Sequence, residues 1–122
     1  QVYRDFVELP SKIMENWITQ KDCLLLFARH HETDEPIPKE LIEGIIAAKK
    51  YNAGIHMLGQ LRLSILDMAW HSADPSGIKD ISSFEDDVVS RTRLFPKIDG
   101  TNISCTFNHM FSGCYLAGYY SY

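Results

Sequence analysis

The stretch Ile55-His-Met-Leu-Gly-Gln-Leu-Arg-Leu-Ser-Ile-Leu-Asp-Met-Ala-Trp-His71 decides the fold class. Its apolar side chains recur every three or four positions, which is the period of an α-helix with one face toward a core. The stripe consists of Leu58, Leu61, Ile65 and Met68. Arg62 and Asp67 lie off this stripe. The stretch therefore predicts a helix over residues 55–71, the strongest in the chain.

Three earlier runs also have helical spacing, over residues 10–18, 23–30 and 39–50. Asp22 is suited to cap the second run, and Pro38 stands at the first turn of the third. The third run has four side chains that we expect to point inward: Leu41, Ile42, Ile45 and Ile46. The first run has a similar stripe, which indicates a helix: Ile13, Met14, Trp17 and Ile18.

The remaining elements are shorter. Turns are expected at residues 74–77 and 96–101, which contain proline and glycine. Ser83 is the expected cap of a short helix around Val88, and residues 103–107 are expected to form a short extended piece. Because no two runs show sustained period-two alternation, the sequence predicts an all-α fold with about five helices.

Length and composition limit the class of protein. A chain of 122 residues holds one domain, and the formal net charge of −4 excludes a basic nucleic-acid-binding face. No apolar run approaches the length of a membrane span. The chain begins with Gln1 and shows no signal-peptide pattern, so we interpret Gln1 as a boundary or a processed end. Three cysteines, an odd count, favour a reducing compartment, and we expect the cytoplasm.

Two groups of residues resemble metal sites only superficially. His30-His31-Glu32 are adjacent, so their side chains point in different directions, and a polar helix end is the better interpretation. Cys105, His109 and Cys114 match no known zinc spacing. The pattern H-E-x-x-H does not occur in the sequence. A complete zinc site is therefore not expected within these residues.

Glu8 and Glu15 are candidate functional acids. Glu8 lies between Val7 and Leu9 just before a helical turn, and a carboxylate among apolar neighbours needs a partner. Glu15 lies seven residues on, two turns along the same face. The two could be a metal ligand and a group that supports it. The alternative is an acid that complements a helix dipole, which composition alone favours.

The last sixteen residues, Phe107-Asn-His-Met-Phe-Ser-Gly-Cys-Tyr-Leu-Ala-Gly-Tyr-Tyr-Ser-Tyr122, combine one imidazole with four phenols. A stabilising core needs few phenols, because each buried hydroxyl must find a partner. A site that binds a developing oxyanion needs such donors. If the segment is helical, Tyr115 and Tyr122 share a face, being seven residues apart. The alternative is an aromatic core stripe that also includes Tyr119.

Four islands of this sequence, in order, resemble the thimet oligopeptidase family of zinc peptidases, in its oligopeptidase A and peptidyl-dipeptidase branch. They are residues 5–17 (DFVELPSKIMENW), 31–38 (HETDEPIP), 66–71 (LDMAWH) and 107–122. The resemblance covers nearly the whole chain. It implies that the 122 residues are a single partial domain from the helical catalytic half of a zincin-like peptidase.

In that family two histidines of H-E-x-x-H and a later glutamate hold the zinc, and the matching glutamate is Glu8. The motif lies about two dozen residues before that glutamate in the family, so it cannot be in this chain, where only seven residues precede Glu8. The resemblance therefore implies a fragment that carries one zinc ligand. We expect no zinc to be bound by the fragment alone, because one carboxylate cannot hold Zn²⁺ against water.

The family also positions a histidine and two tyrosines to bind substrate and oxyanion, and these map to His109, Tyr115 and Tyr122. The loop before the first tyrosine usually has glycine or alanine, whereas this chain has Ser112 and Cys114 around Gly113. Cys114 could stiffen that loop, make it redox-sensitive, or be a small packed hydrophobe.

The resemblance implies a cytoplasmic zinc metallopeptidase that hydrolyses short peptides when full-length. The fragment alone is expected to be inactive and to self-associate through exposed apolar faces. The alternative is a non-enzymatic helical interaction module or a degenerate peptidase relative. The sequence leaves open whether dipeptides are removed from C-termini or bonds are cut internally.

Overall fold

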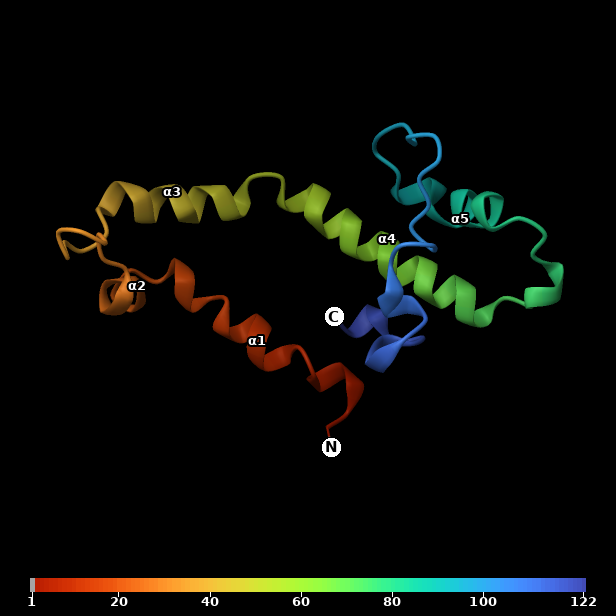
Figure 1. Cartoon of the computed structure of the whole chain (residues 1–122), viewed down its shortest axis with the longest axis horizontal. Coiled ribbons are helices and arrows are strands. Elements are labelled where there is room, and N and C mark those ends of the chain that lie inside the picture. Colours follow the sequence, from red (N-terminus) through yellow and green to blue (C-terminus); the bar gives the residue numbers. More distant parts are fainter. Residues whose placement is uncertain (1) are drawn as a thin grey trace. The chain divides into compact units, whose positions relative to one another are not determined.

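The computed structural model describes residues 2–122, except the side chain of Cys114 (Figure 1). These residues form five α-helices and no strand, which confirms the predicted all-α fold with about five helices. The helices are α1 (Leu9–Met14), α2 (Lys21–Phe27), α3 (Lys39–Lys50), α4 (Ala53–Ser72) and α5 (Ile81–Val89). Within the described part of the chain, no helix has the length and apolarity that crossing a membrane requires.

The chain divides into two compact units. Residues 6–53 form one, here called the α1–α3 unit. Of the described residues, 2–5 and 54–122 form the other, here called the α4–α5 unit.

In the α1–α3 unit the predicted helix over residues 10–18 is shorter than expected. α1 ends at Met14, and a separate 3-10 turn follows at Trp17–Thr19. The Asn16 N–H donates to the carbonyl of Ile13 (3.1 Å), three residues earlier rather than four. This is the hydrogen bond of a 3-10 turn, and it ends the α-helix.

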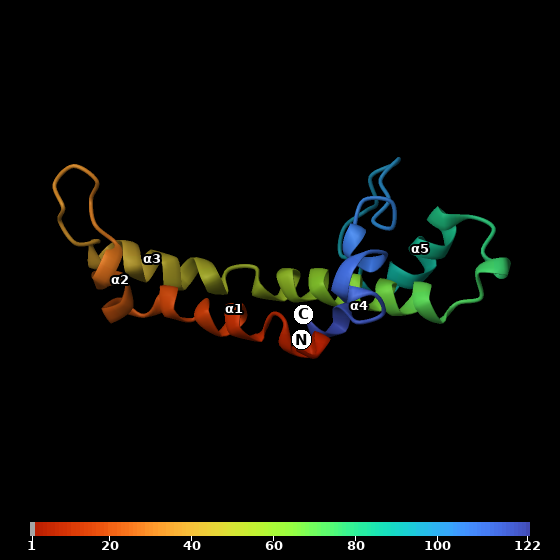
Figure 2. The ribbon, with the colours of Figure 1, turned by 60° about the horizontal axis from the view of Figure 1, so that its bottom comes forward.

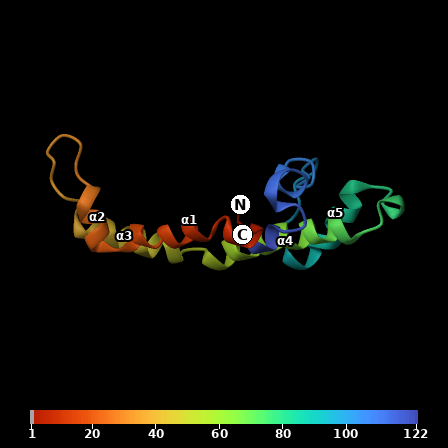
Figure 3. The same cartoon turned by 90° about the horizontal axis from the view of Figure 1, so that it is seen from below.

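The second predicted helix, residues 23–30, ends early because its last residues pair with another segment. Ala28 is extended, and its carbonyl accepts from the Ile37 N–H at 2.9 Å. The His30 N–H donates to the Glu35 carbonyl at 2.8 Å. This pairing makes the loop between α2 and α3, which projects beyond both helices in Figures 2 and 3.

α3 has the predicted bounds, but its expected inward face is only partly covered. Ile42 is buried at 4% exposure, whereas Leu41 is 59% exposed and Ile45 and Ile46 are 36–37% exposed. The expectation that all four point into a core is therefore wrong for these described residues.

In the α4–α5 unit, α4 extends the predicted helix 55–71 by only a residue or two at each end. Its buried face differs from the predicted stripe, because Leu66 and Asp67 are both at 0% exposure, whereas Leu61, Ile65 and Met68 are 43–46% exposed. A polar residue therefore occupies the most enclosed part of the helix. The reason is a set of hydrogen bonds to the end of the chain, described below.

The core of the α4–α5 unit is small. Leu66, Val89 and Met110 are buried together, one from α4, one from α5 and one from the terminal segment. Trp70 packs against them, and its Nε1 donates to the Ser104 hydroxyl at 2.8 Å. α5 and the terminal segment thus both lie on α4, as Figure 1 shows.

Two local predictions in this unit are wrong. The cap of α5 is Asp80, whose Oδ1 accepts from the Ser83 N–H at 2.7 Å, so Ser83 lies inside the helix. Residues 103–107 form a turn rather than an extended piece, since the Phe107 N–H donates to the Ile103 carbonyl at 2.9 Å. The carboxylate of Glu85, buried at 3% exposure, holds this turn by accepting from the N–H groups of Ile103 (2.9 Å) and Ser104 (2.7 Å).

The cap at Asp80 makes stability depend on pH. Hydrogen bonds from Ser83, its hydroxyl first and its backbone N–H second, hold the pKa of Asp80 below its ordinary value of 3.8. The stability that this group contributes is therefore present above pH 3.8 and is lost as the pH falls through the lower folded-state pKa. We expect Asp80→Ala to lower the midpoint of thermal unfolding, measured by circular dichroism, at neutral pH. The difference from wild type should shrink in acid.

Asp87→Ala, an exposed acid on the same helix, is the matched control and should change the midpoint little. A deficit of Asp80→Ala that stays constant from neutral pH to well below pH 3.8 would contradict the capping role.

Candidate active site

The terminal segment is a chain of turns. It contains 3-10 turns at Asn108–Met110, Gly113–Tyr115 and Tyr119–Ser121. Gly113 (φ +83°) and Ala117 (φ +52°) adopt left-handed conformations, which interrupt a right-handed helix. The premise that Tyr115 and Tyr122 share the face of one helix is therefore wrong.

The turns nevertheless bring the three candidate residues of this segment together. The ring centroids of His109 and Tyr115 are 5.5 Å apart, and those of Tyr115 and Tyr122 are 6.3 Å apart. Tyr119 stacks on Tyr122 at 5.4 Å with an interplanar angle of 5°. Phe107 stacks on His109 at 5.1 Å. We call these five rings the terminal aromatic cluster.

One side of the terminal aromatic cluster is open. His109 is exposed and Tyr122 is 41% exposed, whereas Tyr115 and Tyr119 are buried at 8% and 6%. A cavity of about 270 Å³ adjoins the cluster and is lined by Asn108, His109, Ser112, Gly113 and Tyr115. An imidazole and a phenol thus border a space that a small peptide group can enter.

Gly113 fits its position because a left-handed φ suits glycine. This agrees with a small-residue loop before Tyr115. The predictions about Cys114 concern a side chain that lies outside the described residues.

Asp67 holds the backbone between Tyr115 and Tyr122. Its Oδ1 accepts from the Ala117 N–H at 3.2 Å, and its Oδ2 accepts from the Tyr119 N–H at 3.0 Å. His71, one turn along α4, places Nδ1 2.8 Å from the Asp67 carbonyl oxygen and 3.1 Å from Asp67 Oδ1. A carboxylate on α4 therefore fixes a segment about 50 residues further along the chain.

Two more side chains hold the same segment. The Tyr119 hydroxyl donates to Gln60 Oε1 at 3.1 Å, and Arg4 Nη1 donates to the Leu116 carbonyl at 2.6 Å. Sequence reasoning missed Asp67, Gln60 and Arg4. For Asp67 a signal was present, because it stands between Leu66 and Met68 in the most apolar helix, and a carboxylate in such a place requires partners.

Glu8, the predicted zinc ligand, lies in the α1–α3 unit. It is half-buried at the N-cap of α1, and its Oε2 accepts from the Ser11 hydroxyl at 3.0 Å. Glu15, at the other end of α1, pairs with Lys12 at 3.1 Å. A glutamate carboxylate is a donor that zinc accepts, but no group of three His, Cys, Asp or Glu side chains gathers anywhere among the described residues. A complete zinc site would thus need ligands from outside these residues.

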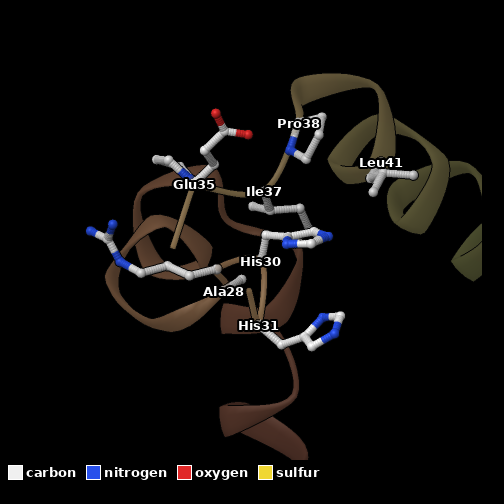
Figure 4. A pocket seen from close by; sticks show the side chains of 9 residues that line it. Ala28, His30, His31, Glu35, Ile37, Pro38 and Leu41 are labelled. Atoms are coloured by element: carbon white, nitrogen blue, oxygen red, sulfur yellow. The ribbon is translucent and has the colours of Figure 1, made fainter. Parts of the chain in front are cut away.

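His30 and His31 line a cavity of about 380 Å³ in the α1–α3 unit, together with Glu35, Ile37 and Leu41 (Figure 4). His30 Nδ1 accepts from the Glu32 and Thr33 N–H groups, both at 3.3 Å. This imidazole therefore shapes the loop between α2 and α3.

The model of peptidase family M3 matches residues 1–122. The chain belongs to peptidase family M3. The family assignment agrees with the four sequence islands and confirms the resemblance stated above.

Family M3 relatives of this chain include organellar oligopeptidase A, chloroplastic/mitochondrial, of Arabidopsis thaliana, which is 39% identical over 119 residues. Oligopeptidase A of Escherichia coli is 37% identical over 120 residues, and dipeptidyl carboxypeptidase of the same species is 36% identical over 121 residues. These alignments cover 97%, 97% and 98% of this chain. The chain spans only 15–18% of the length of these relatives.

Proposed function

We propose that the full-length protein is a zinc-dependent peptidase that hydrolyses short peptides, as an oligopeptidase or a peptidyl-dipeptidase. Membership of peptidase family M3 supports peptide hydrolysis. The observation that carries the proposal is the gathering of His109, Tyr115 and Tyr122 in one cluster beside an open cavity. In this proposal the 122 residues are part of one catalytic domain.

The proposed chemistry assigns a role to each of these side chains. Zinc, when bound, polarises the scissile carbonyl and lowers the pKa of its water. The hydroxyls of Tyr115 and Tyr122 donate to the carbonyl oxygen as it becomes an anion, and one such donor contributes about 3 kcal/mol to lowering the barrier. His109 orients the peptide. Glu8 supplies one metal ligand, and the other ligands and the general base come from residues outside this chain.

The proposal also places the protein in the cytoplasm. An odd number of cysteines is typical of a reducing compartment, and one relative carries the name probable cytosolic oligopeptidase A. The alternative function, a non-enzymatic helical interaction module, is separated from the peptidase by the experiments that follow.

Tyrosine substitutions in the full-length protein test the oxyanion role. We expect Tyr122→Phe and Tyr115→Phe each to lower kcat by about 10²–10³-fold, because a donor present only in the transition state is lost. The matched control is Tyr119→Phe, since the Tyr119 hydroxyl already donates to Gln60. It should lower stability slightly and lower kcat far less than Tyr115→Phe or Tyr122→Phe does. Unchanged turnover of a short fluorogenic peptide by both Tyr115→Phe and Tyr122→Phe would exclude the proposed site.

Metal content tests the role of Glu8. The full-length protein should retain one zinc after dialysis, measured by plasma mass spectrometry, and Glu8→Gln should lose most of it together with activity, because an amide is a poorer ligand than a carboxylate. Glu43→Gln, which removes an exposed acid paired with Lys39, is the matched control and should retain the metal. The isolated 122-residue chain should bind no stoichiometric zinc. One tightly bound zinc in that chain would refute the shared-site proposal.

We also propose that the isolated 122-residue chain self-associates. Large apolar side chains are exposed in both units, among them Leu26 (80%), Ile98 (74%) and Phe95 (64%). Burying such surface is favourable, so light scattering should show mass increasing with concentration. A constant monomer mass at high concentration would contradict this expectation.

A further inference from the structure

We propose that Asp67 is a positioning residue for catalysis: its buried carboxylate sets the places of the Tyr115 and Tyr122 hydroxyls by holding the backbone between them. The inference rests on the proposed function, because it assigns those hydroxyls to the oxyanion. It adds a residue on α4 that does not belong to the terminal aromatic cluster.

The hydrogen bonds of Asp67 reach both tyrosines through short backbone links. The Ala117 and Tyr119 N–H groups each bond one of the two carboxylate oxygens. The Tyr122 N–H donates to the Tyr119 carbonyl at 3.0 Å, and the Gly118 N–H donates to the Tyr115 carbonyl at 2.9 Å. Fixing residues 117–119 therefore fixes the turns on both sides, one carrying each tyrosine.

The backbone at Ala117 needs such an anchor. Its φ of +52° is a left-handed conformation, which costs an alanine about 1–2 kcal/mol. A residue in this conformation persists only where its surroundings hold it. The bond from its own N–H to Asp67 Oδ1 is a direct restraint on that conformation.

A carboxylate suits this position better than any neutral side chain of the same size. It accepts at both oxygens, whereas an amide presents one acceptor and one NH₂ donor. In Asp67→Asn one of the two backbone N–H groups would face a donor instead of an acceptor. The N–H of Ala117 or of Tyr119 would then lose its acceptor at a position that is closed to water, because residue 67 is at 0% exposure. Asparagine has nearly the same shape and volume as aspartate, so the substitution tests the hydrogen bonds and not the packing.

Glu85 provides a matched control. It is buried to a similar extent and uses its two oxygens in the same way, on the Ile103 and Ser104 N–H groups. Ile103 and Ser104 precede the terminal aromatic cluster in the sequence and do not lie between Tyr115 and Tyr122. Glu85→Gln should therefore lower stability as Asp67→Asn does, without a specific effect on the tyrosine hydroxyls.

The experiment is a double-mutant cycle in the full-length protein with a short fluorogenic peptide. We expect Asp67→Asn to lower kcat about 10-fold or more with KM changed less than about 2-fold, because the loss affects the transition state. In the Tyr122→Phe background the same substitution should lower kcat by a smaller factor, about 3-fold, since one of the two hydroxyls that it positions is absent. Glu85→Gln should have the same small effect on kcat in both backgrounds.

His71→Ala keeps the inference testable if Asp67→Asn does not fold. It removes the imidazole 3.1 Å from Asp67 Oδ1 while leaving the carboxylate in place. It should lower kcat in the same direction by a smaller factor, and again less in the Tyr122→Phe background.

Independent, multiplicative effects of Asp67→Asn or His71→Ala and Tyr122→Phe would overturn the positioning role and leave the proposed function intact. So would a kcat for Asp67→Asn equal to that for Glu85→Gln. A wild-type protein that cleaves no peptide would overturn the proposed function and the positioning role together. Unchanged turnover by both Tyr115→Phe and Tyr122→Phe would exclude the proposed site, and the positioning role with it.

Discussion

The α4–α5 unit depends on two buried carboxylates that accept hydrogen bonds from backbone N–H groups. Asp67 on α4 holds residues 117–119, and Glu85 on α5 holds residues 103 and 104. The segment beyond residue 100 has no α-helix, so its N–H groups cannot all pair along their own chain. Carboxylates from two helices replace the missing partners, and an irregular segment thereby gains a definite shape.

That shape explains how the aromatic residues gather without a helix to align them. The left-handed residue at position 117 turns the chain between Tyr115 and Tyr122, whose rings lie 6.3 Å apart although they are seven residues apart in sequence. Within this cluster the phenols differ in their surroundings. The Tyr119 hydroxyl donates to Gln60, whereas Tyr115 borders the cavity and Tyr122 is 41% exposed. Their surroundings, more than their residue type, separate a structural phenol from one suited to meet a substrate.

Sequence reasoning predicted what depends on local spacing. The bounds of α3 and α4 follow from apolar periodicity and from Pro38, and the all-α class follows from the absence of alternation. It failed where a side chain's hydrogen-bond partners are far away in the sequence, and where two neighbouring residues could each cap the same helix. Asp67 has partners about 50 residues away, and no local rule indicates them. Asp80 and Ser83 both suit a cap, and only the fold selects Asp80. The candidates His109, Tyr115 and Tyr122 came from the family resemblance, and the turns that unite them could not be read from spacing.

The proposed chemistry requires the Tyr115 and Tyr122 hydroxyls of the terminal aromatic cluster to bind a developing oxyanion. The most direct measurement is a crystal structure of the full-length protein with a phosphinic peptide, whose tetrahedral phosphinate resembles the intermediate of peptide hydrolysis. We expect a phosphinate oxygen within hydrogen-bond distance, about 2.5–3.0 Å, of the Tyr115 or Tyr122 hydroxyl. A bound phosphinate whose oxygens contact neither tyrosine would contradict it.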